Sequence, residues 1–137
     1  MVPKSHRAKP IHHKGFKGRL RLVTRTLGFR PLSGLTQLQQ LDLSRNQVTD
    51  ISPLSGLTQL QQLDLSRTQV TDVFPLSGLT QLKVLFLNKI QVTDVSPLKH
   101  LPSLTIHTND DDNIEQWRAI GMNVEQYSRF MWLLENL

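Results

Sequence analysis

Two aspartates, Asp42 and Asp64, have the type and spacing that could support chemistry. Each follows a leucine in the segment Leu-Asp-Leu-Ser-Arg, and the two copies are 22 residues apart. On adjacent parallel strands the carboxylates would lie about 5 Å apart, which resembles a pair for general acid and base catalysis. The repeat creates this pair by itself, however, and Arg45, Arg67 and Lys89 recur beside it as charge partners. We therefore expect no catalytic residues.

Other chemical motifs are absent or incomplete. His12 and His13 have no third ligand at helical spacing, and the cluster Asn109–Asn113 lacks the spacing and the glycine of a calcium loop. We interpret that acidic cluster as a turn and helix N-cap. There is no cysteine, and no Walker A, GxSxG, HExxH or dinucleotide motif. The sequence thus predicts a protein that is not an enzyme and uses no cofactor or metal.

An internal repeat organises the chain. The motif Pro-Leu-x-x-Leu begins at Pro31 and returns at Pro53, Pro75 and Pro97, with a period of 22 residues. A fixed period of this size is the signature of a solenoid, in which each repeat buries its apolar face against its neighbours. The apolar frame between two motifs is given by Leu38, Leu41, Leu43, Val48, Ile51, Leu54 and Leu57.

Each repeat is predicted to contain one short strand and one tight turn. Leu41 and Leu43 alternate with polar residues, as in a strand with one buried face. Asn46 follows at the turn, where its amide can serve buried backbone groups. The equivalent residues are Thr68 and Ile90, so we expect this hydrogen bonding to weaken toward the C-terminus and Ile90→Asn to be neutral or stabilising.

The pattern LxxLxxLDLSxNQVTDISPLxGL resembles the 22-residue leucine-rich repeat, of the bacterial subtype similar to internalins and to the phosphatase-regulator repeats of eukaryotes. It extends from Thr26 to about His107. The resemblance implies an α/β solenoid: a right-handed coil with a parallel sheet on the concave face and short 3₁₀, helical or extended turns on the convex face. The matching positions are structural, whereas binding residues in such proteins occupy the variable positions.

Four segments follow from this frame. Residues 1–18 are a basic arm predicted to be disordered, and residues 19–34 are a degenerate N-terminal repeat whose apolar residues lie one position out of frame. Residues 35–108 are the leucine-rich repeats. Residues 109–137 are predicted to be a helical C-terminal cap. The residues at helical spacing in this cap are Ile114, Trp117 and Ile120, then, after Gly121, Val124, Tyr127, Met131 and Leu134.

Charge is distributed unevenly along the 137 residues. Residues 1–30 hold nine basic side chains and no acidic one, a charge of +9, whereas the whole chain has a net charge of +5. The arm is either a solvated tail, a contact through residues 1–30 with nucleic acid or an anionic surface, or a targeting segment. Neither a membrane span nor a secretory signal is visible, so we expect a cytoplasmic monomer.

The third repeat departs from the first two on the outward face of the predicted sheet. Val84, Phe86 and Asn88 replace glutamine, aspartate and serine. An apolar pair on a polar surface is typical of a binding anchor. Alternatively, the C-terminal segment folds over Val84 and Phe86. The predicted partner-binding residues are Gln40, Asp42, Gln62, Asp64, Val84, Phe86 and Asn88.

These observations predict a non-catalytic module that binds a protein partner of unknown identity through its concave face. Two alternatives remain open. One is an adaptor for nucleic acid or an anionic surface that acts through the basic arm. The other is a truncated remnant of a longer leucine-rich-repeat protein.

Overall fold

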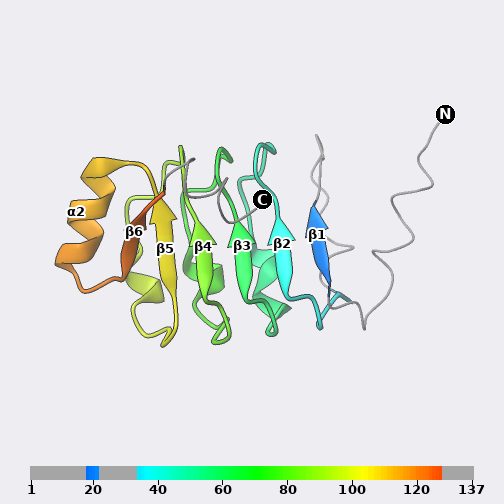
Figure 1. Cartoon of the computed structure of the whole chain (residues 1–137). Coiled ribbons are helices and arrows are strands. Elements are labelled where there is room, and N and C mark those ends of the chain that lie inside the picture. Colours follow the sequence, from blue (N-terminus) through cyan, green and yellow to red (C-terminus); the bar gives the residue numbers. More distant parts are fainter. Residues whose placement is uncertain (1–17, 22–33, 128–137) are drawn as a thin grey trace, which may run out of the picture.

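In the part of the chain that the structure describes, a parallel sheet of six strands forms one wall (Figure 1). The structure is a computed structural model, and it describes residues 18–21 and 34–127. The strands lie side by side in chain order, as predicted for a solenoid. They are β1 (Arg19–Arg21), β2 (Gln40–Asp42), β3 (Gln62–Asp64), β4 (Val84–Phe86), β5 (Thr105–Thr108) and β6 (Val124–Gln126).

The register of the sheet follows the leucine frame. Leu41 pairs with Leu63, and Leu63 pairs with Leu85, so the 22-residue period places equivalent side chains in one row. These central leucines point inward and are buried, whereas their neighbours along each strand point outward. The spacing is shorter outside β2 to β4, because Leu20 pairs with Leu41 and Leu85 pairs with Ile106, each 21 positions apart, and Ile106 pairs with Val124, 18 positions apart.

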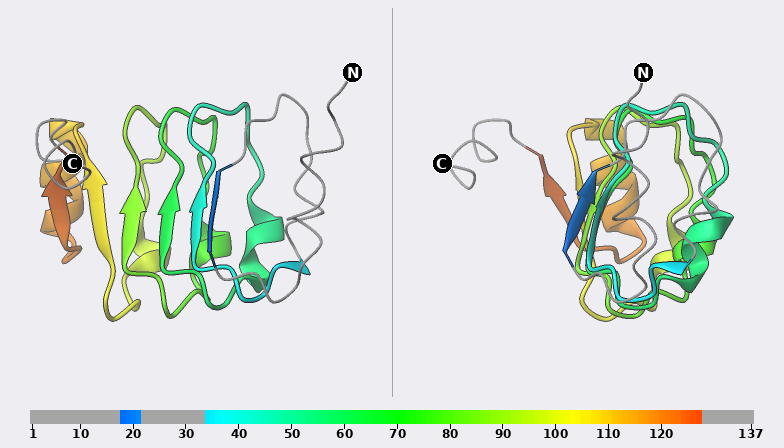
Figure 2. Two further views of the ribbon diagram at one scale, coloured as in Figure 1. Left: turned by 45° about the vertical axis from the view of Figure 1, so that its right-hand side comes forward. Right: turned by 90° about the vertical axis from the view of Figure 1, so that its right-hand side faces the viewer.

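Within residues 35–127, three short 3₁₀ helices, η2 (Ser52–Gly56), η3 (Phe74–Leu76) and η4 (Ser96–Leu98), form the opposite wall. The end-on view in Figure 2 shows the sheet on one side of the coil and these turns on the other. Each carries proline at its first or second position, where the missing N–H costs nothing. Before η2, the side chain of Asp50 accepts a hydrogen bond from the Ser52 N–H at 2.9 Å, and the later repeats copy this contact.

The turns after the strands differ from the sequence prediction in the third repeat. The Asn46 amide donates to the Leu43 carbonyl at 3.0 Å, and the Thr68 hydroxyl donates to the Leu65 carbonyl at 2.7 Å, as expected. The corresponding Leu87 carbonyl, however, accepts from the Thr108 hydroxyl of β5 at 3.1 Å. The expected weakening at Ile90 is therefore wrong, because the next strand supplies the missing donor.

The N-terminal end of the solenoid contains the degenerate strand that the sequence predicts. Leu20 in β1 is half-buried and packs against the core, with Arg19 and Arg21 exposed beside it. The offset of one residue that the sequence showed is absorbed by the 21-residue spacing to β2. Residues 1–17 of the basic arm and residues 22–33 of the degenerate repeat lie outside the described residues.

At the C-terminal end, helix α2 (Asp111–Ala119) begins at an Asp110 N-cap, whose carboxylate accepts from the Asn113 N–H at 3.3 Å. Trp117 is buried, and its indole donates to the Thr93 carbonyl at 2.9 Å. The cap prediction is correct for this helix but wrong for residues 124–126, which form β6; residues 128–137, with Met131 and Leu134, lie outside the described residues. Gly121 adopts a positive φ of 96° and turns the chain back, so that Val124–Gln126 pair with the exposed edge of β5. Pairing of the edge's backbone groups overrides the helical spacing.

Candidate functional site

The outward face of the sheet carries two rows of side chains, and the structure brings the predicted binding residues together there. The row at the start of the strands contains Gln40, Gln62 and Val84, in register with Arg19 and Thr105. The parallel row toward the strand ends contains Arg21, Asp42, Asp64, Phe86, His107 and Glu125. Asn88 lies just beyond the end of β4.

The two aspartates have different environments. Asp42 is 6% exposed, and its carboxylate forms an ion pair with Arg21 at 2.8 Å and accepts from the Ser44 N–H and hydroxyl. Its oxygens are thus engaged within the chain. Asp64 is half-buried and accepts from the Ser66 N–H at 2.9 Å. Burial raises the pKa of the Asp64 carboxyl above its usual value, although the hydrogen bond from Ser66 opposes this.

Phe86 lies in an aromatic cluster that it forms with His107 and Tyr127. Its ring centre is 5.1 Å from that of His107 and 5.7 Å from that of Tyr127, which meets it edge-on. All three side chains are half-buried, so the cluster is partly covered from the C-terminal side yet keeps an exposed surface. The contact with Tyr127 supports the alternative in which C-terminal residues cover Phe86, and its role as a binding anchor stays a prediction. The sequence analysis missed His107 and Tyr127, although the change of spacing to 21 residues would have placed His107 beside Phe86.

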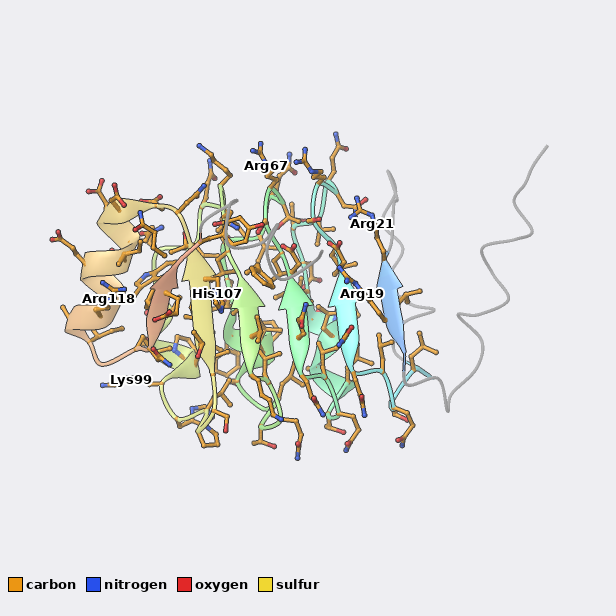
Figure 3. All side chains as sticks on the ribbon, viewed as in Figure 1. Arg19, Arg21, Arg67, Lys99, His107 and Arg118 are labelled. Atoms are coloured by element: carbon orange, nitrogen blue, oxygen red, sulfur yellow. The ribbon has the colours of Figure 1, made fainter. Side chains whose placement is uncertain are left out.

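A polar hollow of about 390 Å³ lies next to this cluster, beyond the carboxyl ends of β2, β3 and β4. Three of its lining residues form what we call the basic row: Arg45, Arg67 and Lys89, all exposed. Figure 3 shows Arg67 beyond the carboxyl ends of the strands, whereas Lys99 follows η4. The other lining residues are Ser44, Asp64, Ser66, Asn88, Asn109 and Tyr127.

The basic row has an unusual backbone conformation. Arg45, Arg67 and Lys89 have φ angles of 64°, 59° and 52°, in the left-handed region that favours glycine, asparagine and aspartate. The sequence analysis treated this row as charge partners of the aspartates. The ion pair that forms on the described part of the sheet is instead made by Arg21 with Asp42.

Two further features bear on function. Among residues 18–21 and 34–127, no helix has the length and apolar character needed to cross a membrane. Within the same ranges, no three potential metal ligands from histidine, aspartate and glutamate come together.

The geometry defines the class of protein first: an α/β solenoid of parallel coils with 3₁₀ turns on the convex side and a helix at the C-terminal end. Comparison with known proteins agrees with this class. A family model described as leucine-rich repeats in two copies matches residues 36–78 and again residues 58–100. No curated protein sequence matches the chain.

Two solved internalins from Listeria monocytogenes are similar in structure. Internalin C2 is 33% identical, with a TM-score of 0.70 over 88% of this chain and 56% of its own. The internalin InlF is 25% identical, with a TM-score of 0.50 over 77% of this chain and 41% of its own. This chain thus spans roughly half the length of the relatives that it matches. It is a leucine-rich-repeat protein, similar to internalins.

Proposed function

We propose that this leucine-rich-repeat chain is a non-catalytic module that binds a partner protein across the concave face of its sheet. The observation that carries the proposal is the half-exposed aromatic cluster of Phe86, His107 and Tyr127, set in an otherwise polar face. Aromatic side chains surrounded by polar contacts are the usual centres of protein interfaces. The polar surroundings are provided by Gln40, Gln62 and Asp64.

The predicted contact residues differ in how much of their surface is exposed. Asp42 is 6% exposed, so a partner that rests on the sheet reaches it least, and Asn88, which is 8% exposed, lines the hollow beyond the end of β4. Gln40, Gln62, Asp64, Val84 and Phe86 offer more surface. We place the centre of the interface at Val84 and Phe86, with Gln62 and Asp64 at its edge.

A pair of phenylalanines on opposite walls allows a matched test. Phe86 lies on the concave face, whereas Phe74 lies in η3 on the convex wall and is 63% exposed. A photoreactive residue at Gln62 should crosslink the partner in the native cell. Phe86→Ala should remove that product, because loss of a central aromatic weakens binding by about 2 kcal/mol or more, while Phe74→Ala should leave it.

A crosslinked product that survives Phe86→Ala but not Phe74→Ala would place the interface on the convex wall and contradict the proposal. Chemical denaturation of both variants must accompany the experiment. If Phe86→Ala unfolds the chain, Phe86→Leu keeps an apolar core contact and removes only the aromatic surface, so the comparison can still be made.

A second candidate function follows from the nine basic side chains in residues 1–30. We propose it as the alternative: contact with nucleic acid through counterion release, which is strongly salt-dependent. A salt titration of RNA and DNA binding, with and without residues 1–18, would test it. Binding that is independent of the arm would contradict this alternative.

A further inference from the structure

The polar hollow beside the aromatic cluster has a charge of its own. Arg45, Arg67 and Lys89 contribute three positive charges, and Asp64 is the one carboxylate among the described lining residues, which leaves a net charge of +2. Within residues 18–21 and 34–127, none of the three cations forms an ion pair. The basic row is therefore available to an anionic group from outside the chain.

The fold accounts for the turn at these positions, because the Arg45 and Arg67 N–H groups donate to the Ser66 and Asn88 carbonyls of the next coil, but it does not require a cation there. A residue other than glycine in the left-handed region costs about 1–2 kcal/mol, and long side chains bring no local hydrogen bond that offsets it. The third repeat has also changed at Val84, Phe86, Asn88 and Ile90, yet position 89 keeps a positive charge.

Asn88, which lines the hollow, carries a side-chain acceptor without a donor among the described residues. Asn88 is 8% exposed, and no described residue donates a hydrogen bond to its Oδ1 atom. A buried polar atom without a partner costs about 1–3 kcal/mol, which a ligand with an N–H group would recover. The Asp64 carboxylate, which lines the same hollow, is a further acceptor.

The ligand must therefore present anions to the basic row and donors to Asn88 and Asp64. An extended peptide with acidic side chains does both, because its backbone N–H groups alternate with its carboxylates. A phosphodiester backbone presents acceptors only, apart from the 2′-hydroxyl of RNA, and would face Asp64 without a donor. The chemistry of the hollow favours the peptide.

The dimensions also suit a peptide. Neighbouring strands lie about 4.8 Å apart, so the three cations span about 10 Å, the length of about three residues of an extended chain. A volume of about 390 Å³ is within the usual range of ligand sites.

We propose that the hollow between the basic row and Asn88 binds an extended acidic segment of the partner protein, with carboxylates on Arg67 and Lys89 and a backbone N–H on the Asn88 side-chain oxygen. This proposal rests on the proposed function, since it names the chemistry of the partner that the concave face binds. It adds an electrostatic contact with the basic row to the apolar contact with the aromatic cluster.

Nuclear magnetic resonance of the full chain can test this site by residue. An N-acetylated, C-amidated hexaglutamate peptide is titrated into ¹⁵N-labelled protein, with hexaglutamine as the uncharged match. We expect saturable shifts at the amides of Ser66, Arg67, Asn88 and Lys89 with hexaglutamate only. Shifts confined to residues 1–30 would overturn the proposal, because the peptide would then sit on the basic arm.

Charge-matched variants separate the site from general attraction. The double variant Arg67→Asn with Lys89→Asn removes two charges and supplies a residue that tolerates a positive φ, so the turns should keep their fold. It should bind hexaglutamate about tenfold more weakly. Lys83→Gln with Lys99→Gln removes the same charge from exposed positions off the hollow and should leave binding unchanged. Equal losses in both variants would overturn the proposal.

Titration with hexathymidylate tests whether the hollow prefers a phosphodiester backbone to an acidic peptide. If it shifts the same four amides at lower concentration than hexaglutamate, the site binds phosphodiesters and the acidic-peptide proposal falls. Failure of hexaglutamate while the crosslink at Gln62 still depends on Phe86 would overturn this site alone and leave the concave-face interface in place.

Discussion

Thr108 performs at the third turn the role that Asn46 and Thr68 perform within their own repeats. Its hydroxyl lies on the next strand and donates to the Leu87 carbonyl, and it also accepts from the Asp110 N–H at 3.2 Å. The side chain is fully buried. One hydroxyl therefore joins β4, β5 and the start of the C-terminal helix.

Removal of this hydroxyl should be costly, and position 90 should be able to compensate. Thr108→Val should lower the free energy of unfolding by about 1–3 kcal/mol, because the Leu87 carbonyl loses its donor. Ile90→Asn alone should also destabilise, since it buries an amide whose natural acceptor is already engaged. In the double variant the new amide can donate to Leu87, so the loss should be smaller than the sum. Urea denaturation of the four proteins measures this coupling.

Thr71→Val, at an exposed position, is the control and should change little. Strictly additive losses at positions 90 and 108 would contradict the shared-carbonyl explanation.

Asp64 gives the fold a dependence on pH of unusual sign. Because burial raises its pKa, the folded chain holds this proton to a higher pH than the unfolded chain does. Stability should therefore fall as pH rises from about 4, the usual carboxyl pKa, through the raised pKa of Asp64. Asp64→Asn should become progressively more stable than the natural protein across that window. The free energy of unfolding, measured from about pH 3 to about pH 8, checks the trend.

Asp50→Asn is the matched control with the opposite sign. The hydrogen bond from the Ser52 N–H lowers the pKa of the exposed Asp50 carboxyl. Its contribution to stability is present above the usual carboxyl pKa and is lost as pH falls through the lowered value. If both variants follow the same trend with pH, the environment assigned to Asp64 is wrong.

At the scale of elements, Gly121 determines where α2 ends and β6 begins. Its φ of 96° lies in a region that other residues avoid, and an added Cβ would meet nothing closer than Lys99 Cε at 4.0 Å. Gly121→Ala should therefore destabilise by about 1–2 kcal/mol through backbone strain alone. Thermal or chemical unfolding measures the loss.

Gly78→Ala provides the comparison for that variant. A Cβ at Gly78 meets nothing within 4 Å, and its φ is not in the left-handed range. Alanine there should be neutral or stabilise by up to about 1 kcal/mol, because it restricts the unfolded chain. Equal losses of stability in both variants would contradict the claim that the positive φ of Gly121 requires glycine.

Elements within the repeat could be predicted from sequence, and elements beyond it could not. The alternation at Leu41 and Leu43 and the Asp-x-x-Pro segments fix β2 to β4 and the 3₁₀ turns, because the same local pattern occurs in every copy. β6 was not predicted, because its Val124 pairs with Ile106 on β5, only 18 positions earlier, and this spacing does not match the 22-residue period. For the same reason the sequence predicted Phe86 as an anchor but not its contacts with His107 and Tyr127.

At the scale of the whole molecule, the solenoid is stabilised between neighbouring coils. Leu63 pairs directly with Leu85, whereas Val124 lies three strands away from β3. Energetic coupling in such repeat proteins is confined to neighbouring repeats.

Pairs of core substitutions should show that energetic coupling is limited to neighbouring coils. Leu63→Val with Leu85→Val should deviate from additivity by about 0.5 kcal/mol or more, because the two cavities share their lining. Leu63→Val with Val124→Ala should be additive within about 0.5 kcal/mol. Urea denaturation of the single and double variants gives both values. Strong coupling across the distant pair would mean that the molecule does not behave as a chain of adjacent coils.

The fixed 22-residue period also allows the folding chain to pair its coils in an alternative register. Residues 35–56 and 57–78 differ at only three positions, namely 46 and 68, 51 and 73, and 52 and 74. A chain that slips by one coil during folding can therefore place the second copy where the first belongs, with nearly the same core. Besides those three positions, irregular features tell the two arrangements apart: the 21-residue steps from β1 to β2 and from β4 to β5, the Arg21–Asp42 ion pair and the contact of Phe86 with His107. These departures from the repeat therefore specify the position of each coil in the folded protein.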